Sequence, residues 1–466
     1  MTAVMQRKPG LDPGIDLRQA ATTLCTDVAN AGRFADAAGS LLRFVPEWGW
    51  LHWDGRRWAR DTLGVVRKMA QDVHTFVRAE AAAAKNPQVA DALWRHAKYT
   101  AGSTAISAML REAEPLLAER VGTFDQYPFH VNCHNCTMAF IHLEGGVPHH
   151  YRAHQGDYLT RMIPHDWHMG ARRVAWENFL AEVLPDAEVR AFVQRALGYS
   201  MLGHTREQCF FILHGTGCNG KSVFLNTIKA VLGEDYARQA DPECFMSGKA
   251  ATMRNDLARL QGVRFVTAVE SGDGQRLDES LIKSITGGDA IQARFLYREY
   301  FEFVPQFKLW LATNHPPRIR GTDHAIWRRV MLVPFTVTIP DKRRDPALQE
   351  TLLRESEGIL DWLVEGCVAY CKYGLAPPPP VRAATQAYRD SEDVAGQFLA
   401  DHAVFERTAQ CAKKAMYAAY LQWCDRNGER AVSQRAFSKL LQSHGLDEYR
   451  GTGGTRYWIG VRLKPE

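Results

Sequence analysis

Gly215-Thr216-Gly217-Cys218-Asn219-Gly220-Lys221-Ser222 contains two glycines separated by four residues and followed by Lys-Ser. In this pattern the glycines let backbone N–H groups approach a triphosphate, the lysine neutralises its β and γ oxygens, and the serine hydroxyl binds Mg²⁺. A tight turn that needs glycine for a positive φ is the alternative. The flanks favour a phosphate loop, because an apolar, strand-like run (209–213) precedes it and apolar residues at helical spacing follow it up to Gly233. We therefore expect residues 215–222 to bind ATP, with Ser222 on Mg²⁺.

Three further apolar runs of strand type follow the loop, at residues 265–269, 309–313 and 330–335. The gaps between them leave room for crossover segments, so the sequence predicts an α/β fold with a mostly parallel sheet. Ligands of such sheets bind at the C-terminal ends of the strands, where Glu270 and Asn314 stand out. Glu270 would hold the Mg²⁺ shell and polarise the attacking water, and Asn314 would orient that water against the γ-phosphate. Taken singly, each could equally be a polar residue that ends a strand.

Arg328 and Arg329 precede the last of these runs, and nothing within one chain obviously needs them. An arginine supplied by a neighbouring subunit stabilises the charge that develops on a transferring phosphoryl group. The alternative for this pair is a set of surface salt bridges.

The order of these features resembles the superfamily 3 helicases, the AAA+ ring motors of small viruses, phages and plasmids. It is most similar to the helicase part of phage and plasmid primase-helicases and of poxvirus-type replication ATPases. Roughly residues 40–463 are covered, and the matching segments are 215–222, the strand ending at Glu270, 282–289 with 294–297, 310–317, and 326–330 with 333–335. The resemblance implies catalytic roles for Lys221, Glu270, Asn314 and Arg329. It places Mg²⁺ on Ser222 and Glu270, and it favours Arg329 over Arg328 as the finger of the neighbouring subunit.

The resemblance also implies an organisation into an AAA+ P-loop ATPase core with an α+β N-terminal domain, a helical collar and a C-terminal winged helix. Local patterns agree with it, since aromatic strands flank Asp54-Gly55, two helices meet at Pro185-Asp186, and a stiff, extended connector is predicted at 376–380. A long helix is expected over 348–371. The predicted segments are an arm (1–36), the α+β domain (37–170), the collar (171–205), the ATPase domain (206–375), a Pro-rich linker (376–392) and a winged-helix DNA-binding domain (393–466).

Residues 291–296 and 301–304 predict the strands of a hairpin whose tip, 297–300, is charged and aromatic. In the family such a hairpin projects into the channel of the ring and grips one DNA strand. The candidate DNA contacts here are Lys283, Arg294, Tyr297 and Arg298, a mixture of basic and stacking groups that suits sequence-tolerant binding of a single strand. An ordinary hairpin with solvated basic residues is the alternative.

The C-terminal tail from residue 431 to residue 466 has six basic and three acidic residues, or a net charge of +3. Helices are expected at 413–426, with an apolar stripe that suits a core, and at 433–443, followed by a flexible loop (450–456) and a strand. A winged helix of this kind would bind duplex DNA through Arg435, Lys439, Arg450 and Arg456. It could equally be a protein-interaction module.

The 466 residues carry a net charge of +5, are 46% hydrophobic and 23% charged, and indicate a folded protein of about three domains. No apolar run is long enough to span a membrane, and no secretory core opens the chain, so we expect no membrane partner and an intracellular location. Ten dispersed cysteines argue for reduced thiols. Cys133-His134-Asn135-Cys136 has zinc-knuckle spacing, but its incomplete ligand set favours ordinary strand and loop residues. It also stands where the family usually has an Asn-Gly turn.

These patterns together predict an ATP-dependent DNA helicase of phage, plasmid or mobile-element replication, an ATP hydrolase that acts in the cytoplasm of a bacterial host. It would bind single-stranded and forked DNA and assemble as a homo-hexamer with ATP sites between subunits. Too few residues precede Trp48 for the primase-polymerase domain of the family, so we expect a separate primase. The alternative is a DNA-binding replication initiator or loader that uses ATP as an assembly switch.

Overall fold

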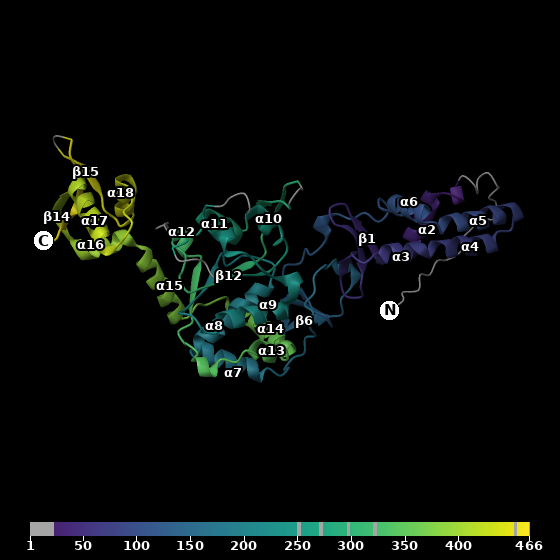
Figure 1. Cartoon of the computed structure of the whole chain (residues 1–466), viewed down its shortest axis with the longest axis horizontal. Coiled ribbons are helices and arrows are strands. Elements are labelled where there is room, and N and C mark those ends of the chain that lie inside the picture. The colour runs from purple at the N-terminus through teal and green to yellow at the C-terminus, as the bar shows by residue number, and fades with distance from the viewer. Residues whose placement is uncertain are drawn as a thin grey trace. The chain divides into compact units, whose positions relative to one another are not determined.

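The computed structural model describes residues 23–248, 253–269, 274–295, 299–319, 324–451 and 454–465. It divides into two compact units, one of residues 1–139 and 149–166 and the other of residues 140–148 and 167–466. Each unit is taken by itself below (Figure 1).

The first unit combines helices with short antiparallel strands. Its elements are α2 (Asp27–Ala38), β1 (Leu42–Val45), β2 (Gly49–Trp53), β3 (Trp58–Arg60), α3 (Val65–Gln71), α4 (Val73–Ala83), α5 (Pro87–Thr100), α6 (Ser103–Ala113) and β4 (His130–Asn132). The predicted aromatic hairpin is confirmed, because β2 and β3 pair antiparallel around a turn in which Asp54 accepts from the N–H groups of Arg56 and Arg57. β4 continues into a sheet with β5 (Thr137–Glu144) and β6 (Val147–Tyr151).

The irregular arm expected over residues 1–36 ends earlier than predicted. Residues 27–36 belong to α2, which begins at the N-cap Thr26, whose side chain accepts from the N–H of Ala29. Phe34 and Ala38 lie one turn apart in the core of the unit. Burial of this apolar face therefore stabilises a helix at the start of the described chain.

A five-stranded parallel sheet forms the centre of the second unit, which confirms the predicted mixed α/β class. Its order is β13-β7-β12-β9-β8, with β7 (Phe210–His214), β8 (Ala237–Gln239), β9 (Phe265–Val269), β12 (Lys308–Thr313) and β13 (Val330–Pro334). The strand before the phosphate loop, β7, lies between β12 and β13. The sequence missed β8, because three residues are too short for a periodic signal.

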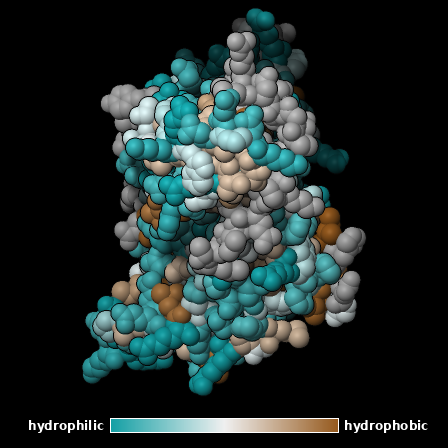
Figure 2. All heavy atoms as spheres, turned by 90° about the vertical axis from the view of Figure 1, so that its right-hand side faces the viewer, coloured by the Kyte–Doolittle hydropathy of each residue, from teal (hydrophilic) through white to brown (hydrophobic). Residues whose placement is uncertain are grey.

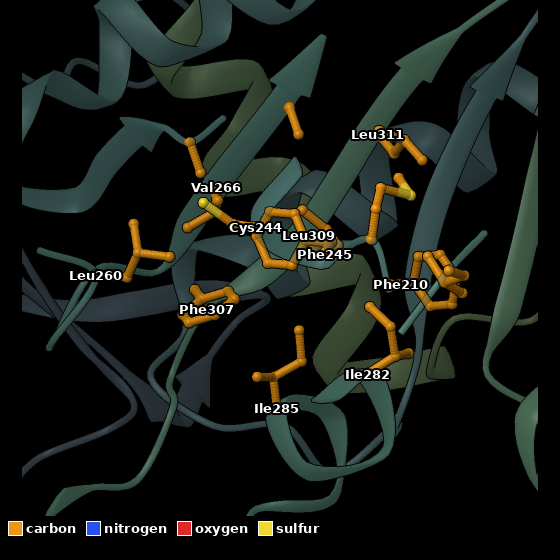
Figure 3. Packing of buried hydrophobic residues seen from close by; sticks show 14 of the residues in the cluster. Phe210, Cys244, Phe245, Leu260, Val266, Ile282, Ile285, Phe307, Leu309 and Leu311 are labelled. Atoms are coloured by element: carbon orange, nitrogen blue, oxygen red, sulfur yellow. The ribbon is translucent and has the colours of Figure 1, made fainter. Parts of the chain in front are cut away.

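The other elements of this part of the chain pack around the sheet. They are α7 (Val174–Val183), α8 (Ala187–Met201), α9 (Lys221–Tyr236), α10 (Met253–Ala258), α11 (Glu279–Gly287), β10 (Ile291–Ala293), β11 (Phe301–Phe303), α12 (His324–Trp327), α13 (Leu348–Leu353) and α14 (Ser356–Tyr373). The paired helices at Pro185-Asp186 are confirmed, whereas the helix expected over 348–371 is two helices, α13 and α14. Figure 3 shows Ile282 and Ile285 of α11 pointing into the apolar core beside Phe210 of β7.

The helices α8 and α14 cross at very close range. A Cβ atom on Gly198 would lie 2.0 Å from the backbone nitrogen of Cys367, and one on Gly366 would lie 2.2 Å from the carbonyl oxygen of Gln194. Only glycine permits this approach, which fixes α14 against α8.

The segment predicted as a Pro-rich linker is mostly helical. Helix α15 (Pro379–Glu392) begins within the proline run, where proline suits the first turn of a helix. Thr385 accepts from the N–H of Leu332 on β13, and Tyr388 is buried in the core beneath the sheet. The expected extended connector is therefore limited to the residues before α15.

The C-terminal part consists of α16 (Val394–His402), β14 (Ala403–Ala412), α17 (Lys413–Asn427), α18 (Gln434–Ser443), β15 (Glu448–Arg450) and β16 (Arg456–Leu463). The strands form a sheet in the order β14-β16-β15. Met416, Tyr420 and Trp423 of α17 lie in the core of this part, as the apolar stripe predicted. None of the described helices is long and apolar enough to cross a bilayer, and the face drawn in Figure 2 is mostly hydrophilic.

Candidate nucleotide and nucleic-acid sites

The phosphate loop joins the end of β7 to the start of α9 and surrounds the buried amine of Lys221. The Lys221 Nζ donates to the carbonyl oxygen of Gly215 at 2.7 Å and to the amide oxygens of Asn219 and Asn314 at 3.0 Å each. Thr216, Gly217, Cys218 and Ser222 are exposed. A cation is thus held at a loop in which these four residues are open to a ligand, whereas Gly215 and Asn219 are buried.

The glycines of the loop have different structural roles. A Cβ on Gly215 would lie 2.1 Å from the carbonyl oxygen of Phe335, whereas one on Gly217 would meet nothing within 4 Å. Gly220 has a φ of +82° and is the N-cap of α9, which has no side-chain cap. No described side chain therefore caps the start of α9, where the helix dipole favours an anion.

Asn314 lies beside the phosphate loop because β12 pairs with β7. Thr313 is the register partner of His214, so the residues that follow these two strands lie side by side at the carboxyl edge of the sheet. The contact between Lys221 and Asn314 follows from this pairing. Burial, together with the charge of Lys221, lowers the pKa of His214 against the effect of a hydrogen bond from the ring to the backbone of Asn314, so the neutral ring is favoured.

Glu270, the predicted catalytic carboxylate, lies outside the described residues. β9, the strand that it follows, is adjacent to β12 in the sheet and ends at Val269. The catalytic role of Glu270 thus stays a prediction, which is supported by the position of β9 in the sheet.

The two arginines before β13 differ in their surroundings. Arg329 is only 7% exposed, and its Nε donates to the Thr286 hydroxyl at 3.0 Å, while its Nη1 donates to the carbonyl oxygen of Ala325. Arg328 is exposed and donates from Nη2 to the Gln208 side chain at 2.6 Å. The residue favoured as the finger is therefore engaged within its own chain.

The predicted hairpin is confirmed at its base, where β10 pairs antiparallel with β11. These strands are shorter than predicted and end at Ala293 and start at Phe301. Arg294 is exposed and lies 4.8 Å over the ring of Tyr300. Lys283 is half-buried on α11, and the predicted contacts Tyr297 and Arg298 lie outside the described residues.

A groove of about 690 Å³ runs between α18, the start of α17 and the β15–β16 ribbon. The predicted contacts Arg435, Lys439 and Arg456 line it, together with Lys413 and Lys414, which the sequence reading missed. Lys413 and Arg456 both pair with Glu448, but within the described chain no ion pair involves Lys414, Arg435 or Lys439. Arg450 is exposed at the end of β15 and does not line the groove.

Cys133 and Cys136 lie at the turn between β4 and β5. The N–H of Cys133 donates to the carbonyl oxygen of Cys136 at 2.7 Å. Burial raises the pKa of Cys133 well above its usual range and that of Cys136 to about 11, with Asp166 adding to the second shift. Both thiols are protonated in this environment, and the preference for ordinary strand and loop residues stays a prediction.

Comparisons with known proteins agree with the order of these elements. The family described as D5 N terminal like matches residues 31–185, and a family of unknown function (DUF5906) matches residues 213–329. A protein of Acanthamoeba polyphaga mimivirus, named as a candidate helicase, is 30% identical over 246 residues, which are 49% of this chain and 26% of that protein. One of Frog virus 3, also named as a candidate helicase, is 28% identical over 62% of this chain and 31% of its own length.

A protein of African swine fever virus, named as a candidate primase, is 22% identical over 68% of this chain and 36% of that protein. The chain thus spans about a third or less of each of these relatives. Among solved structures, the C-terminal region of NrS-1 aligns over 64% of this chain and 78% of its own, with 10% identity and a TM-score of 0.42, which is too low to carry an argument. The family matches and the viral relatives support a place for this chain among the primase-helicases of viruses and phages, in the superfamily 3 helicase region.

Proposed function

We propose that this chain is the ATP-hydrolysing motor of a DNA helicase that works as a ring of identical subunits, a hexamer with ATP sites between them. The observation that carries the proposal is the contact between Lys221 and Asn314 at the carboxyl edge of a parallel sheet, beside the uncapped start of α9. A cation, an amide and the N-terminus of a helix meet there, as a site for phosphoryl transfer requires.

The residues present fit ATP and Mg²⁺. Gly217 has open space around it, so the loop backbone can approach phosphates, and the exposed Ser222 hydroxyl is available to a cation. Glu270 is the proposed second ligand and the group that polarises the attacking water, with Asn314 orienting that water. Bound Mg²⁺ would supply charge neutralisation on the phosphates.

The position of the arginines supports shared sites. Val330 pairs with Phe210 and Pro334 with His214, so the start of β13 lies at the opposite end of the sheet from the phosphate loop, roughly 13 Å away along the strand. Arg328 therefore cannot serve the loop of its own chain. Because Arg328 is exposed and Arg329 is buried, we assign the finger of the neighbouring subunit to Arg328, which reverses the preference drawn from the resemblance.

Two surfaces are proposed for DNA. The β10–β11 hairpin would hold single-stranded DNA through Lys283, Arg294, Tyr297 and Arg298, where Tyr300 under Arg294 adds an aromatic face. The groove at α18, which we interpret as the face of a winged helix, would hold the phosphates of the duplex. Replacing Arg435 and Lys439 by Ala should weaken duplex binding and flatten its salt dependence; unchanged binding would favour a protein-interaction module instead.

The rival proposal is a replication initiator or loader that uses ATP as an assembly switch. A strand-displacement assay on a forked duplex separates the two, with the Lys221→Ala chain as control. ATP-dependent displacement supports the helicase, whereas steady DNA-stimulated ATPase without displaced strand supports the rival. A P-loop kinase for a small molecule is a third reading, but it leaves the basic groove, the hairpin and the arginine pair without roles.

The partners follow from this proposal. A separate primase would supply primers for the ring, and the place of action would be the cytoplasm of a bacterial host in which the encoding phage or mobile element replicates. Copurification of primer-synthesis activity with the tagged chain from such a host would test the first point.

A further inference from the structure

The buried guanidinium of Arg329 is a junction between elements that the proposed mechanism must move together. Its Nε donates to Thr286 near the end of α11, and its Nη1 to the Ala325 carbonyl in α12. Its backbone carbonyl accepts from the N–H of Phe210, the first residue of β7, at 2.9 Å. Arg329 therefore connects α11, α12 and the strand that leads to the phosphate loop.

Helix α11 in turn leads directly to the hairpin proposed to hold DNA. Thr286 lies one residue before the end of α11, Gly288 turns the chain with a φ of +83°, and β10 begins at Ile291. Ile282 and Ile285 of α11 share one core with buried residues of β10, β11 and α12. Because such a core is packed like a solid, a shift of the hairpin base displaces α11 as well.

The neighbour of Arg329 is the arginine assigned to the next subunit's ATP site. Arg328 projects away from the core, and its guanidinium is steadied by Gln208, two residues before β7. The two arginines are consecutive, so a displacement of the Arg329 side chain by Thr286 moves the backbone that carries Arg328. This link runs from the hairpin to the finger without passing through the phosphate loop.

We propose that the hydrogen bond between Arg329 and Thr286 couples DNA held by the hairpin to the position of Arg328 in the neighbouring site. Arg329 is then a positioning residue, and the contact is the means by which DNA stimulates hydrolysis. The proposal rests on the proposed function and adds how DNA would regulate it. It implies a coupling free energy between the DNA site at the hairpin and the neighbouring ATP site.

The test uses Thr286→Val in the full chain, because valine keeps the shape of threonine and removes the acceptor of the Arg329 Nε. The wild-type chain should show DNA-stimulated ATPase, by about fivefold or more. In Thr286→Val the basal rate and the affinity for single-stranded DNA should stay unchanged while the stimulation is lost. Thr286→Ser, which retains the hydroxyl, should restore it, and Ser284→Ala on the same helix serves as the matched control.

Wild-type stimulation in Thr286→Val would overturn the coupling and leave the helicase proposal intact. Equal losses of basal and stimulated rate in Thr286→Val, not restored by serine, would show a merely structural contact and also overturn it. An inactive wild-type chain would instead refute the proposed function itself. These outcomes are distinct, so failure of the coupling and failure of the motor cannot be confused.

Discussion

Two buried lysines stand at opposite ends of the same sheet, and their surroundings differ. Lys221, at the carboxyl end, is the first residue of α9, where the helix dipole is unfavourable to a cation. Lys308, at the amino end, is 1% exposed and donates to the carbonyl oxygens of Leu202 and His204 just beyond the end of α8, where the dipole favours a cation. It also donates to the carbonyl oxygen of Gln306, two residues before it in the chain. Each amine donates to three internal oxygens, so the hydrogen bonds do not distinguish the two lysines; the helix end beside each one does.

The amino end gathers further cations in the same way. Arg264, 3% exposed before β9, donates to the carbonyl oxygen of Met201 at 2.8 Å. Arg329 before β13 donates to Ala325 and Thr286. Charged residues at this end therefore hold the fold together, with the exposed Arg328, the proposed finger, as the exception. The comparison teaches that burial of a basic side chain does not by itself indicate a ligand; the helix end beside it decides.

Lys221→Ala should show the largest effect, a loss of kcat for ATP hydrolysis of about 10²–10³-fold or more, because the alanine cannot stabilise charge on the phosphates. The melting temperature should change less than in Lys308→Ala, because removing a cation from the start of α9 offsets part of the loss of three hydrogen bonds. Steady-state ATPase and thermal unfolding of the variant measure both quantities. Full turnover would remove Lys221 from the site.

Lys308→Ala should give the opposite pattern. Loss of the amine leaves three carbonyl oxygens without their donor and should lower the free energy of unfolding by about 1–3 kcal/mol. The kcat of the folded protein should be retained, because Lys308 lies at the end of the sheet remote from the phosphate loop. Denaturant unfolding with parallel ATPase measurements checks this. A selective loss of kcat would contradict the different roles assigned to the two ends of the sheet.

Gly215→Ala and Gly217→Ala separate the folding role of the loop from its binding role. The new methyl at 215 meets Phe335 and should cost about 1–3 kcal/mol of stability before any ligand is added. At 217 it enters open space, so stability should not change while affinity for an ATP analogue falls. Calorimetry measures the stability of both variants and their affinity for the analogue. Equal losses of stability at the two positions would contradict the separation of roles.

Histidines at the two ends give the smallest expected effect. Burial, then Lys308 and the nearby arginines, lowers the pKa of His204 to about 3, whereas the shift of His214 is smaller. Between pH 6.5 and pH 3 the unfolded chain binds a proton at His204 that the folded chain does not, so stability falls as the pH falls. His204→Gln should therefore flatten the acid side of the melting curve more than His214→Gln. The reverse order would mean that the cations of the amino end do not act on His204.

Much of the region around the phosphate loop could be predicted from the sequence, because the signals for its elements are local and short. The phosphate loop, the strands β7, β9, β12 and β13, and Asn314 were predicted where the structure has them. What escaped depends on contacts between distant segments. Lys308 was missed since a lysine does not look like the start of a buried strand, and α15 since the proline run masked the apolar face that carries Tyr388.

The choice between Arg328 and Arg329 shows the same limit. Their order in the sequence gives no information on which one faces outward, because this depends on α11 supplying Thr286. Lys413 and Lys414 likewise join the basic groove only when α17 folds beside α18. Side-chain direction, unlike strand order, is set by tertiary packing.

The central claim, that each ATP site is shared between two subunits, is tested most directly by mixing two inactive chains. Lys221→Ala supplies an intact Arg328, and Arg328→Ala supplies an intact phosphate loop. The account predicts that each variant alone hydrolyses ATP at background and that the mixture regains DNA-stimulated ATPase, most strongly near equal amounts. Mixed rings without activity at any ratio would contradict it.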